Sequence, residues 1–513
     1  MTAPSDTDVL IAGAGPTGLV LAIWLTRLGV RVRIIDKSAE PAIASRALAI
    51  QARTLEFYGQ LGFADEVVAR GRRVLAIDLW VRGRRVARAP FGSMGVGLSP
   101  FPYVLIFPQD EHERLLINQL ASLGVRVERQ TELLSFEETA DGVLGRLKLA
   151  DGCEQTCHAA FLAGCDGARS TVRQQLNIGF PGGQYTHLFY VADVQATGPV
   201  ANGEINIALD RADFLAVFPL HDDGRVRLVG TVREDAQNQN AELTWDDVSQ
   251  RVLSWLRLDI TSVHWFSTYR VHHRVADHFR HGRAFLLGDA AHIHSPVGGQ
   301  GMNTGIGDAV NLAWKLANVL HRRAPAGILD TYEPERIAFA RRLVATTDRA
   351  FTAVTSGKPL ARFFRLHVAP RLVPALFSTS STRRFMFRTA AQITIRYRES
   401  TLSDGGAGAV HGGERLPWVQ TADNHRGNFA PLSSLDWQVH IYGVAPPDLH
   451  SVCDQRRIAL HVFPWDNQVA HAGLRPNALY LVRPDGYVAF ASPQASSAAL
   501  AQFLDARALL PPA

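Results

Sequence analysis

The sequence predicts an α/β protein with a Rossmann-like domain, an inserted antiparallel sheet and a further C-terminal domain. Three observations support this prediction. A Gly-x-Gly-x-x-Gly motif directly follows the apolar residues 9–12, alternating strand-like runs lie between residues 181 and 270, and a glycine-rich stretch at 405–413 precedes the C-terminal part. The chain has 513 residues, 47% hydrophobic and 20% charged, which is long enough for two or three globular domains.

The first motif has the layout of a phosphate-binding turn. Residues 9–12 predict a buried parallel strand, Gly13 makes the tight turn after it, and Gly15 lets the backbone approach a pyrophosphate. Gly18 allows the following helix to lie close to the sheet, and Pro16 suits its first turn, where a missing N–H costs nothing. The N-terminus of this helix offers N–H groups to phosphates, so the segment predicts a dinucleotide site.

An acid follows at the spacing that a dinucleotide site requires. Residues 30–35 predict a second strand, and Asp36 ends it about 20 residues after the glycines, where a carboxylate binds a ribose hydroxyl. An isolated glycine motif would be weak, but here the strand, helix, second strand and acid are in register. We therefore expect Asp36 and the adjacent Lys37 to contact the nucleotide.

Residues 9–26 carry no charge and are long enough to suggest a membrane span. Three glycines and a proline in the first half argue against a span, because the stretch divides naturally into a short strand, a turn and a helix. Asp6 and Asp8 precede it in place of Lys or Arg, which makes it a poor secretory signal. We expect a soluble, cytoplasmic protein that does not bind a membrane.

Charge and cysteine content argue against two further classes of protein. The net charge is +5 and the arginines are scattered, so the sequence does not favour nucleic-acid binding. Four cysteines in so long a chain do not form a disulfide framework. Cys153 and Cys157 lie close together but lack a matching second pair, so we interpret them as structural thiols and expect no metal site.

Two later glycine-rich segments are expected to join the same site. Residues 163–170 contain an Asp-Gly pair beginning at Asp166, which by itself would indicate a surface turn. Residues 284–287 predict a short strand, and Asp289 follows at its carboxyl end, before the glycine-rich residues 298–303. Beside the first motif, both segments indicate parts of one cofactor site.

A helix is expected from about residue 304 to residue 320, with its N-terminus pointing into the site. Its apolar residues are spaced along one side: Ile306, Val310, Ala313 and Ala317. The dipole at this N-terminus would favour negative charge on a bound group. His292 and His294 lack a third metal ligand at sensible spacing, so we interpret them as histidines that shape the loop or line a cavity.

The segments between the motifs predict the inserted sheet. Alternating runs at 215–218 and 226–229 indicate an antiparallel sheet that forms one wall of a substrate cavity. Elsewhere we expect extended runs at 74–91 and 101–107, a helix at 110–123 opened by Gln109, and strands at 125–127 and 143–149. The expected domains are 1–180 with a substrate-domain segment at about 74–107, 181–270 for the sheet, 271–350 for the second part of the first domain, 351–400 for a helical region and 401–513 for the C-terminal domain.

Together, the three glycine-rich segments resemble the single-component FAD-dependent aromatic hydroxylases, the flavoprotein monooxygenases of the phenol hydroxylase and polyketide hydroxylase type. The resemblance covers most of the first 350 residues. It implies FAD as cofactor, NADPH or NADH and O2 as co-substrates, and hydroxylation of a phenolic or polycyclic aromatic ring through a C4a-hydroperoxyflavin. Since the chain has no second nucleotide fingerprint, NAD(P)H would bind transiently over the flavin.

The last part of the chain resembles the thioredoxin-like C-terminal domain of several such hydroxylases. Strand-like runs at 439–442 and 478–482 carry this resemblance. The region contains Cys453 but no Cys-x-x-Cys, so we expect a structural role or a subunit contact and no redox role. A homodimer is one option for assembly.

The resemblance also implies roles for individual residues. Arg46 would contact the flavin and help it move between buried and exposed positions, and Pro296 would lie beside the flavin C4a edge, which makes these two the expected catalytic residues. Gln109 would lie near the ribityl chain, which Asp289 would bond, and Asp166 would serve FAD and nicotinamide binding. The expected cofactor-binding set is Gly13, Gly15, Pro16, Thr17, Gly18, Asp36, Lys37, Arg46, Gln109, Asp166, Asp289, Pro296, Gly299, Gly301, Met302 and Asn303.

The sequence leaves alternatives for the reaction and for the pocket. A flavin oxidase, a dehydrogenase or a Baeyer–Villiger oxygenase could use the same scaffold, and so could a non-catalytic flavin-binding protein, although the intact loop at 298–303 argues against the last. The pocket base is not identified: His221, His187 and Tyr190 are candidates by region only. Aromatic residues that either line the cavity or fill the core are Phe189, Phe214, Phe218, Trp265 and Phe266.

Overall fold

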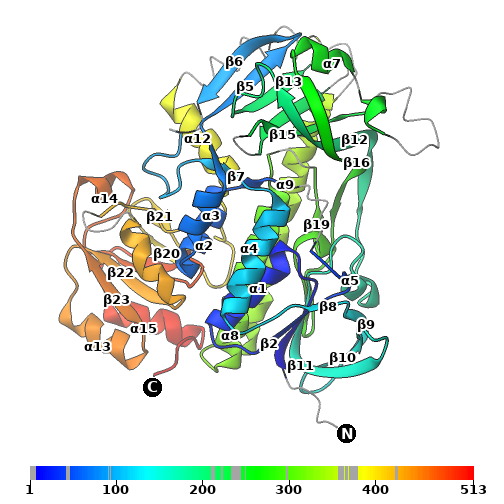
Figure 1. Cartoon of the computed structure of the whole chain (residues 1–513). Helices are drawn as coiled ribbons and strands as arrows, with labels where there is room; N and C mark the ends of the chain where they lie inside the picture. The colour runs from blue at the N-terminus through cyan, green and yellow to red at the C-terminus, as the bar shows by residue number, and fades with distance from the viewer. Residues whose placement is uncertain are drawn as a thin grey trace.

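The computed structural model describes residues 7–41, 47–90, 92, 94–209, 214–220, 223–232, 244–248, 250–295, 298–355, 363, 368, 372, 379–421 and 426–512, without the side chains of 186–187 and 347–355. These residues form an α/β fold in which a mostly parallel sheet, a largely antiparallel sheet and a C-terminal sheet occupy separate parts of the molecule (Figure 1). The predicted fold class is confirmed.

A parallel arrangement of strands forms the centre of the first sheet. Strand β1 (Thr7–Ala12) lies between β11 (Glu154–Gly164) and β2 (Val32–Asp36), and β18 (Ala284–Leu286) pairs with the other side of β11. Because these four strands are parallel, their carboxyl ends meet at one edge, where open α/β sheets bind ligands. The sheet is extended by β8 (Glu128–Arg129), β9 (Glu132–Glu138), β10 (Val143–Lys148) and β17 (Arg280–His281).

Three helices pack together on this sheet: α1 (Pro16–Arg27), α4 (Gln109–Ser122) and α8 (Gly301–Leu320) (Figure 1). The uncharged stretch at 9–26 thus forms β1 and most of α1. In the part of the chain that the structure describes, no helix combines the length and the apolar character needed to cross a membrane. Helix α8 is buried on almost all sides, and η3 (Ala326–Thr331) and α9 (Tyr332–Thr355) follow it.

The predicted starts of one strand and one helix differ from the observed starts by about three residues. The strand expected at 125–127 is β8 at 128–129, because the chain first turns back after α4, with Val125 N–H donating to Leu120 O. Helix α8 begins at Gly301 rather than near residue 304. The Asn303 and Thr304 side chains bond back to the carbonyl groups of residues 299 and 300 and thereby fix the first turn.

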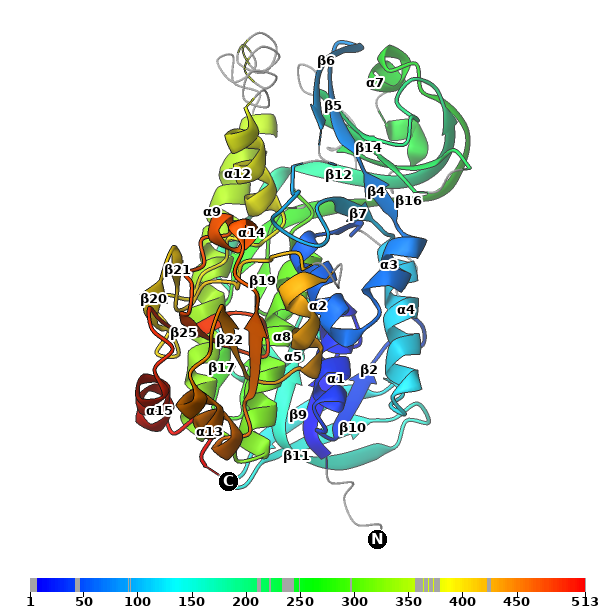
Figure 2. The same ribbon diagram turned by 90° about the vertical axis from the view of Figure 1, so that its left-hand side faces the viewer.

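The inserted sheet has eight strands in the order β19-β16-β12-β15-β14-β13-β5-β6 and lies above the first sheet in Figure 2. Its strands are β5 (Ala76–Val81), β6 (Arg84–Pro90), β12 (Gly182–Thr197), β13 (Ile205–Leu209), β14 (Phe214–Pro219), β15 (Arg225–Thr231), β16 (Asp259–Val275) and β19 (His292–Ile293). The expected antiparallel sheet is confirmed, with one exception: β13 and β5 pair in parallel, which adds residues 76–90 to the sheet.

The two faces of this sheet pack against different partners. On one face, side chains such as Tyr190 and Leu228 form a core with α7 (Gln250–Trp255) and η1 (Trp245–Asp247). On the opposite face, Ile205, Ile207 and Phe218 pack against the large core that includes the first sheet and its helices. We call the second one the inner face, because it packs on the core of the first sheet and its helices.

Smaller elements connect these layers. Strands β3 (Ala49–Ile50), β7 (Val104–Ile106) and β4 (Arg72–Val74) form a three-stranded sheet, and α2 (Ala52–Leu61) and α3 (Ala64–Arg70) lie between β3 and β4 in the chain. Helix α5 (Thr171–Gln175) follows the second motif, and α12 (Ser380–Ala390) precedes the C-terminal part.

The C-terminal part is built around β22 (Gln438–Tyr442), α13 (Pro447–Gln455), β23 (Ala459–Phe463), α14 (Asn467–His471), β24 (Leu479–Val482), β25 (Val488–Ser492) and α15 (Ser497–Ala506). Strand β22 is parallel to β23 and antiparallel to β24, and β24 is antiparallel to β25. This order agrees with the expected thioredoxin-like arrangement. Strands β20 (Asp404–Ala407) and β21 (Val410–His411) and the turns of η5 (Gly427–Ser434) complete it.

Candidate functional site

The turn between β1 and α1 faces open space with uncapped N–H groups. Gly13 N–H donates to Ile35 O at 2.8 Å, and no side chain caps the helix at Gly15 or Pro16. A Cβ added at Gly15 would meet no atom of the described part of the chain within 4 Å. A Cβ at Gly18 would overlap the carbonyl oxygen of Gly13, so glycine is needed there for α1 to lie this close to the turn. The turn is therefore shaped to receive an anionic group.

Asp36 lies at the end of β2 and holds this turn. Its Oδ2 accepts a hydrogen bond from Ala14 N–H at 2.8 Å, and its Oδ1 accepts one from Ser38 N–H at 2.8 Å. The Arg129 guanidinium is 3.8 Å from the carboxylate. Since each carboxylate oxygen has a second lone pair, Asp36 can still accept a ribose hydroxyl. Lys37 follows as an exposed residue.

The third motif lies directly against the first. Residues 288–292, which we call the Asp289 loop, begin with η2 (Gly288–Ala290) at the carboxyl end of β18. Gly288 has φ +58°, and a Cβ there would lie 2.7 Å from Thr17 Oγ1 in α1. The side chain of Asp289 is exposed beside this contact. The structure thus brings the acid of the third motif to the start of the helix of the first motif.

The second motif packs against the same turn. A Cβ at Gly13 would overlap the backbone carbonyl of Cys165, so the two segments touch. Asp166 Oδ2 accepts a hydrogen bond from Val172 N–H at 3.2 Å at the start of α5, and Asp166 Oδ1 is buried without a partner among the described residues. Burial raises the pKa of this carboxyl. A polar ligand could form a hydrogen bond with this buried oxygen.

The residues expected around a flavin ring form the first turn of α8. Asn303 is buried and its amide is fully used within the protein: its oxygen accepts hydrogen bonds from Gln51 N–H at 2.9 Å and Thr54 Oγ1 at 2.7 Å, and its nitrogen donates to Ala49 O and Gly299 O at 2.8 Å each. Asn303 therefore joins α8 to the β3–α2 segment. Met302, next to Gly301, packs on the main core.

Three polar side chains near this helix were not assigned a cofactor role from the sequence. Gln51 donates from Nε2 to Gly298 O at 3.0 Å, and its Oε1 is buried without a partner among the described residues. The same holds for Ser295 Oγ and His294 Nε2. Gln51 lies five positions after Arg46, so the only sequence signal was its place in an already suspected segment.

The protonation of His294 follows from its surroundings. Its Nδ1 lies 2.7 Å from Ser295 O, and since a carbonyl oxygen can only accept, Nδ1 carries the proton. Burial lowers the pKa of His294 to about 4, so the ring is neutral near neutral pH. His294 Nε2 is then a buried hydrogen-bond acceptor. A Cβ at Gly301 would lie 3.6 Å from it, which places this acceptor beside the N-terminus of α8.

These observations fit a dinucleotide cofactor. An open, uncapped glycine turn suits a pyrophosphate, an exposed carboxylate stands beside it, and four buried polar atoms near the motifs lack protein partners among the described residues. A bound group that carries both hydrogen-bond donors and acceptors could supply the missing partners of these atoms. The site matches the chemistry expected from the three motifs.

Several other predicted residues lie outside the described part of the chain, and the contacts of Gln109 leave its predicted role untested. Arg46, Pro296 and His221 lie outside the described residues, as does the side chain of His187. Gln109 accepts a hydrogen bond from Ala47 N–H at 3.3 Å and donates to Glu113 at 2.8 Å, so it holds the segment next to Arg46. Within the described ranges, no group of three His, Cys, Asp or Glu side chains could hold a metal.

Aromatic side chains gather on the inner face of the inserted sheet. Phe189 pairs with Tyr269 across β12 and β16, and both belong to a cluster with Phe214. The same face carries Phe218, which packs on the main core, and Trp265, which lies next to the ion pair of Arg227 with Asp193. Four of the five expected aromatic residues therefore lie on this face.

Two sequence candidates lie on the opposite face. Tyr190 stacks with Phe266 at 6.0 Å between ring centres, and both contact Trp245 in the core beneath α7. Because neighbouring residues of a strand point to opposite faces, Phe189 and Tyr190 are separated by the sheet. Of the two roles left open for Phe266, its position supports core filling, and Tyr190, a pocket-base candidate by region only, lies in the same core.

The chain is similar to known proteins over almost its whole length. Residues 6–347 match the family described as FAD binding domain. The chain is 34% identical to 6-methylpretetramide 4-monooxygenase of Streptomyces rimosus, over 99% of this chain and 95% of that protein. It is 33% identical to rifampicin monooxygenase of Rhodococcus hoagii, over 94% and 95% of the two chains.

Solved structures show the same similarity over the whole length. The OxyS anhydrotetracycline hydroxylase from Streptomyces rimosus has a TM-score of 0.78 at 29% identity, with 99% of this chain and 100% of that chain covered. Aklavinone-11 hydroxylase, solved in a ternary complex with FAD and aklavinone, has a TM-score of 0.79 at 26% identity, again with 99% and 100% covered.

Proposed function

Because the chain belongs to the family of FAD-dependent monooxygenases of the aromatic and polyketide hydroxylase type, we propose that it hydroxylates a phenolic or polycyclic aromatic substrate with NAD(P)H and O2. The observation that carries the proposed substrate class is the group of aromatic side chains on the inner face of the inserted sheet, the face that packs on the core of the first sheet and its helices. Two of the relatives named above are by name a 6-methylpretetramide 4-monooxygenase and an aklavinone-11 hydroxylase, which supports an organic ring compound as substrate.

FAD supplies the redox and oxygen-transfer chemistry when it is bound. The β1–α1 turn at Gly15 would hold the pyrophosphate, and Asp36 and Asp289 would accept hydroxyl groups of the cofactor. The N-terminus of α8, with neutral His294 beside it, would contact the polar end of the ring system. The dipole of this long helix favours negative charge at its N-terminus, which suits a reduced, anionic ring.

The inner face would position the substrate. Phe189, Phe214 and Tyr269 offer ring faces and edges for offset or edge-to-face contacts with a planar aromatic compound. Such a wall also excludes water from the reacting carbon. The Arg227–Asp193 pair, at 2.7 Å, adds a polar group to this otherwise apolar face. NAD(P)H would bind transiently, since the three motifs form a single nucleotide site.

Oxygen isotope labelling tests the proposed reaction. The purified protein would be supplied with NADPH or NADH, 18O2 and a panel of substituted phenols, naphthols and polycyclic quinols. We expect substrate-stimulated oxidation of NAD(P)H together with a product that carries one 18O atom in a new ring hydroxyl. Electron-rich rings should react and alkanes should not, because electrophilic oxygen transfer requires electron density at the acceptor carbon.

The outcomes separate the alternatives. Label in a new ester group would indicate a Baeyer–Villiger oxygenase, and oxidised product without label would indicate an oxidase or dehydrogenase. Stimulated NAD(P)H oxidation without oxygenated product would mark a compound as an effector only. No response to any member of the phenolic panel would reject the proposed substrate class.

Replacing Asp289 with alanine is expected to weaken FAD binding by about tenfold or more, since a hydrogen bond to a charged group contributes about 1.5–3 kcal/mol. The side chain is exposed, so the fold should be unaffected. The FAD content of the purified variant and the release of flavin fluorescence on dilution measure the change. Asp259→Ala, which removes an exposed acid at the start of β16, is the control. Full FAD occupancy in Asp289→Ala would contradict the assignment.

A further inference from the structure

A buried carboxylate lies directly behind the Asp289 loop. Asp308 is in the second turn of α8 and is fully buried. Its Oδ2 accepts two hydrogen bonds from the loop, one from Gly288 N–H at 3.0 Å and one from His292 Nε2 at 2.7 Å. The two donors lie on either side of Asp289, so a single oxygen atom fixes both ends of the segment that presents this acid.

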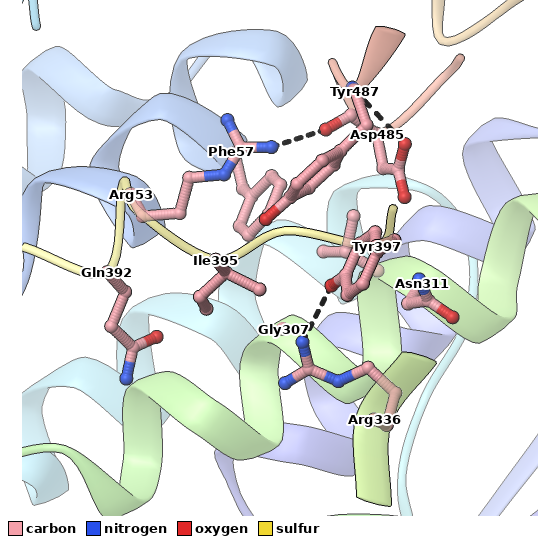
Figure 3. A pocket seen from close by; sticks show the side chains of 11 residues that line it. Arg53, Phe57, Gly307, Asn311, Arg336, Gln392, Ile395, Tyr397, Asp485 and Tyr487 are labelled. Atoms are coloured by element: carbon pink, nitrogen blue, oxygen red, sulfur yellow. Dashed lines mark hydrogen bonds between the residues drawn. The ribbon is translucent and has the colours of Figure 1, made fainter. Parts of the chain in front are cut away.

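The second oxygen of Asp308 is held from α9. Asp308 Oδ1 accepts a hydrogen bond from Arg336 Nε at 2.6 Å, and the same guanidinium donates to Thr304 O at 3.0 Å. It also donates to Tyr397 Oη at 2.8 Å, as Figure 3 shows. Burial alone would raise the pKa of Asp308, but Arg336 and His292 outweigh it and hold the pKa below its ordinary value. Asp308 therefore stays ionised, and its two oxygens remain acceptors only.

The Asp289 loop also contacts α1, on the side away from Asp308. Gly288 adopts φ +58° in contact with Thr17 of α1, at the turn that faces open space near Gly15. The Asp289 loop is thus fixed between α1 and the carboxylate of Asp308. A change at Asp308 would let the loop shift relative to α1, and hydrogen bonds to a ligand at this edge depend on that relative position.

We propose that Asp308 is a positioning residue of the FAD site: it holds the Asp289 loop against α1, so that Asp289 and the glycine turn contact the cofactor together. Asp308 acts through the loop and does not itself need to touch FAD. The proposal concerns cofactor binding and is independent of the identity of the aromatic substrate.

The neighbouring helix supplies a matched control for this proposal. Glu335 precedes Arg336 in α9 and is an equally buried, ion-paired carboxylate, 2.9 Å from Lys315 Nζ and 2.9 Å from Arg483 Nη1. Among the described residues, its hydrogen-bond partners belong to α8, the turn at residue 400 and the C-terminal part, and none belongs to the Asp289 loop. Removing the charge of Glu335 tests the cost of losing a buried carboxylate without loosening the loop.

The experiment compares Asp308→Asn with Glu335→Gln in the full-chain holoenzyme. Asparagine keeps the shape of Asp308 but replaces one acceptor oxygen with a donor, which must face either Arg336 or the loop donors. The dissociation constant of FAD, from flavin fluorescence on dilution, should rise about tenfold or more in Asp308→Asn and by less than about twofold in Glu335→Gln. Both variants should unfold at a lower temperature than the wild type.

A merely structural role would produce a different pattern. If the two variants weaken FAD binding equally, or if Asp308→Asn binds FAD as the wild type does, the proposal is overturned. Should Asp308→Asn not fold, His292→Phe removes one of the two bonds to the loop and leaves the Asp308–Arg336 pair in place. It should raise the FAD dissociation constant about threefold or more and change the visible flavin spectrum, and an unchanged constant and spectrum would equally reject the proposal.

Discussion

Replacing Glu335 with glutamine is expected to lower the free energy of unfolding by about 3–5 kcal/mol, the usual cost of breaking a buried ion pair. The Glu335 side chain is 1% exposed, and its partners Lys315 and Arg483 are both 0% exposed. Glutamine keeps the shape but removes the carboxylate that lies 2.9 Å from the ammonium of Lys315. The denaturant midpoint at neutral pH, with FAD in excess, measures the loss.

The pH dependence of this loss provides a second measurement. Burial alone would raise the pKa of Glu335, but Arg483 and Lys315 hold it well below its ordinary value of 4.5. A carboxylate with a lowered folded-state pKa contributes stability above its ordinary pKa and loses it as the pH falls toward the lowered value. The difference in stability between the wild type and Glu335→Gln should therefore shrink below about pH 4.5.

A surface ion pair is the control for this prediction. Glu154 and Arg146 lie 2.7 Å apart, but their side chains are 53% and 59% exposed. Because water screens such a pair, Glu154→Gln should leave the midpoint at its wild-type value. If Glu335→Gln has as little effect as Glu154→Gln, the buried network does not stabilise the fold. A difference between Glu335→Gln and the wild type that stays constant across the acid range would contradict the pH argument.

The parts of the site that could be predicted from the sequence are local. The β1–α1–β2 unit follows from an apolar strand, three glycines at fixed spacing and Asp36, all within about thirty residues of one another. The Asp289 loop was found in the same way, from a short strand and an acid at its carboxyl end. Such features depend on backbone geometry between sequence neighbours, which a local pattern specifies.

The buried charge network could not be predicted, because the local pattern of α8 indicates exposed rather than buried polar residues. Asp308, Asn311 and Lys315 are spaced along one side of α8, and such a polar stripe normally marks the solvent face of a helix. Here that stripe is buried, since α9 and the C-terminal part supply Glu335, Arg336 and Arg483 as partners. These partners lie in other elements, 20 or more residues along the chain, and the periodicity of α8 carries no information about them.

The orientation of the inserted sheet could not be predicted from local sequence either. Alternation along β12 predicts that Phe189 and Tyr190 point to opposite faces, and they do. It does not predict which face is directed toward the cofactor domain, because that depends on α7 covering one side. Strand β9 was missed for a related reason: its sequence is rich in glutamate, and pairing with β10 stabilises it.

Gly18→Ala is expected to destabilise the fold itself, whereas Gly15→Ala is expected to impair only FAD binding, although both change a glycine of the same motif. A methyl group at Gly18 would overlap the backbone carbonyl of Gly13, so α1 must move away from the turn. Such overpacking costs about 1–3 kcal/mol, and the displaced helix N-terminus should also lose FAD. Among the described residues, no atom lies within 4 Å of a methyl group at Gly15, and the backbone there is in an extended conformation open to alanine.

Thermal unfolding of the FAD-stripped and FAD-saturated proteins separates these two cases. Gly18→Ala should unfold at a lower temperature than the wild type in both states. Gly15→Ala should match the wild type when stripped, or exceed it slightly because alanine restricts the unfolded chain, but should gain less stability on adding FAD. The reason is that no atom of the described residues lies within 4 Å of that methyl group, so we expect the bound cofactor to be the group that meets it. If Gly15→Ala is stabilised by FAD as strongly as the wild type, that space does not hold the pyrophosphate.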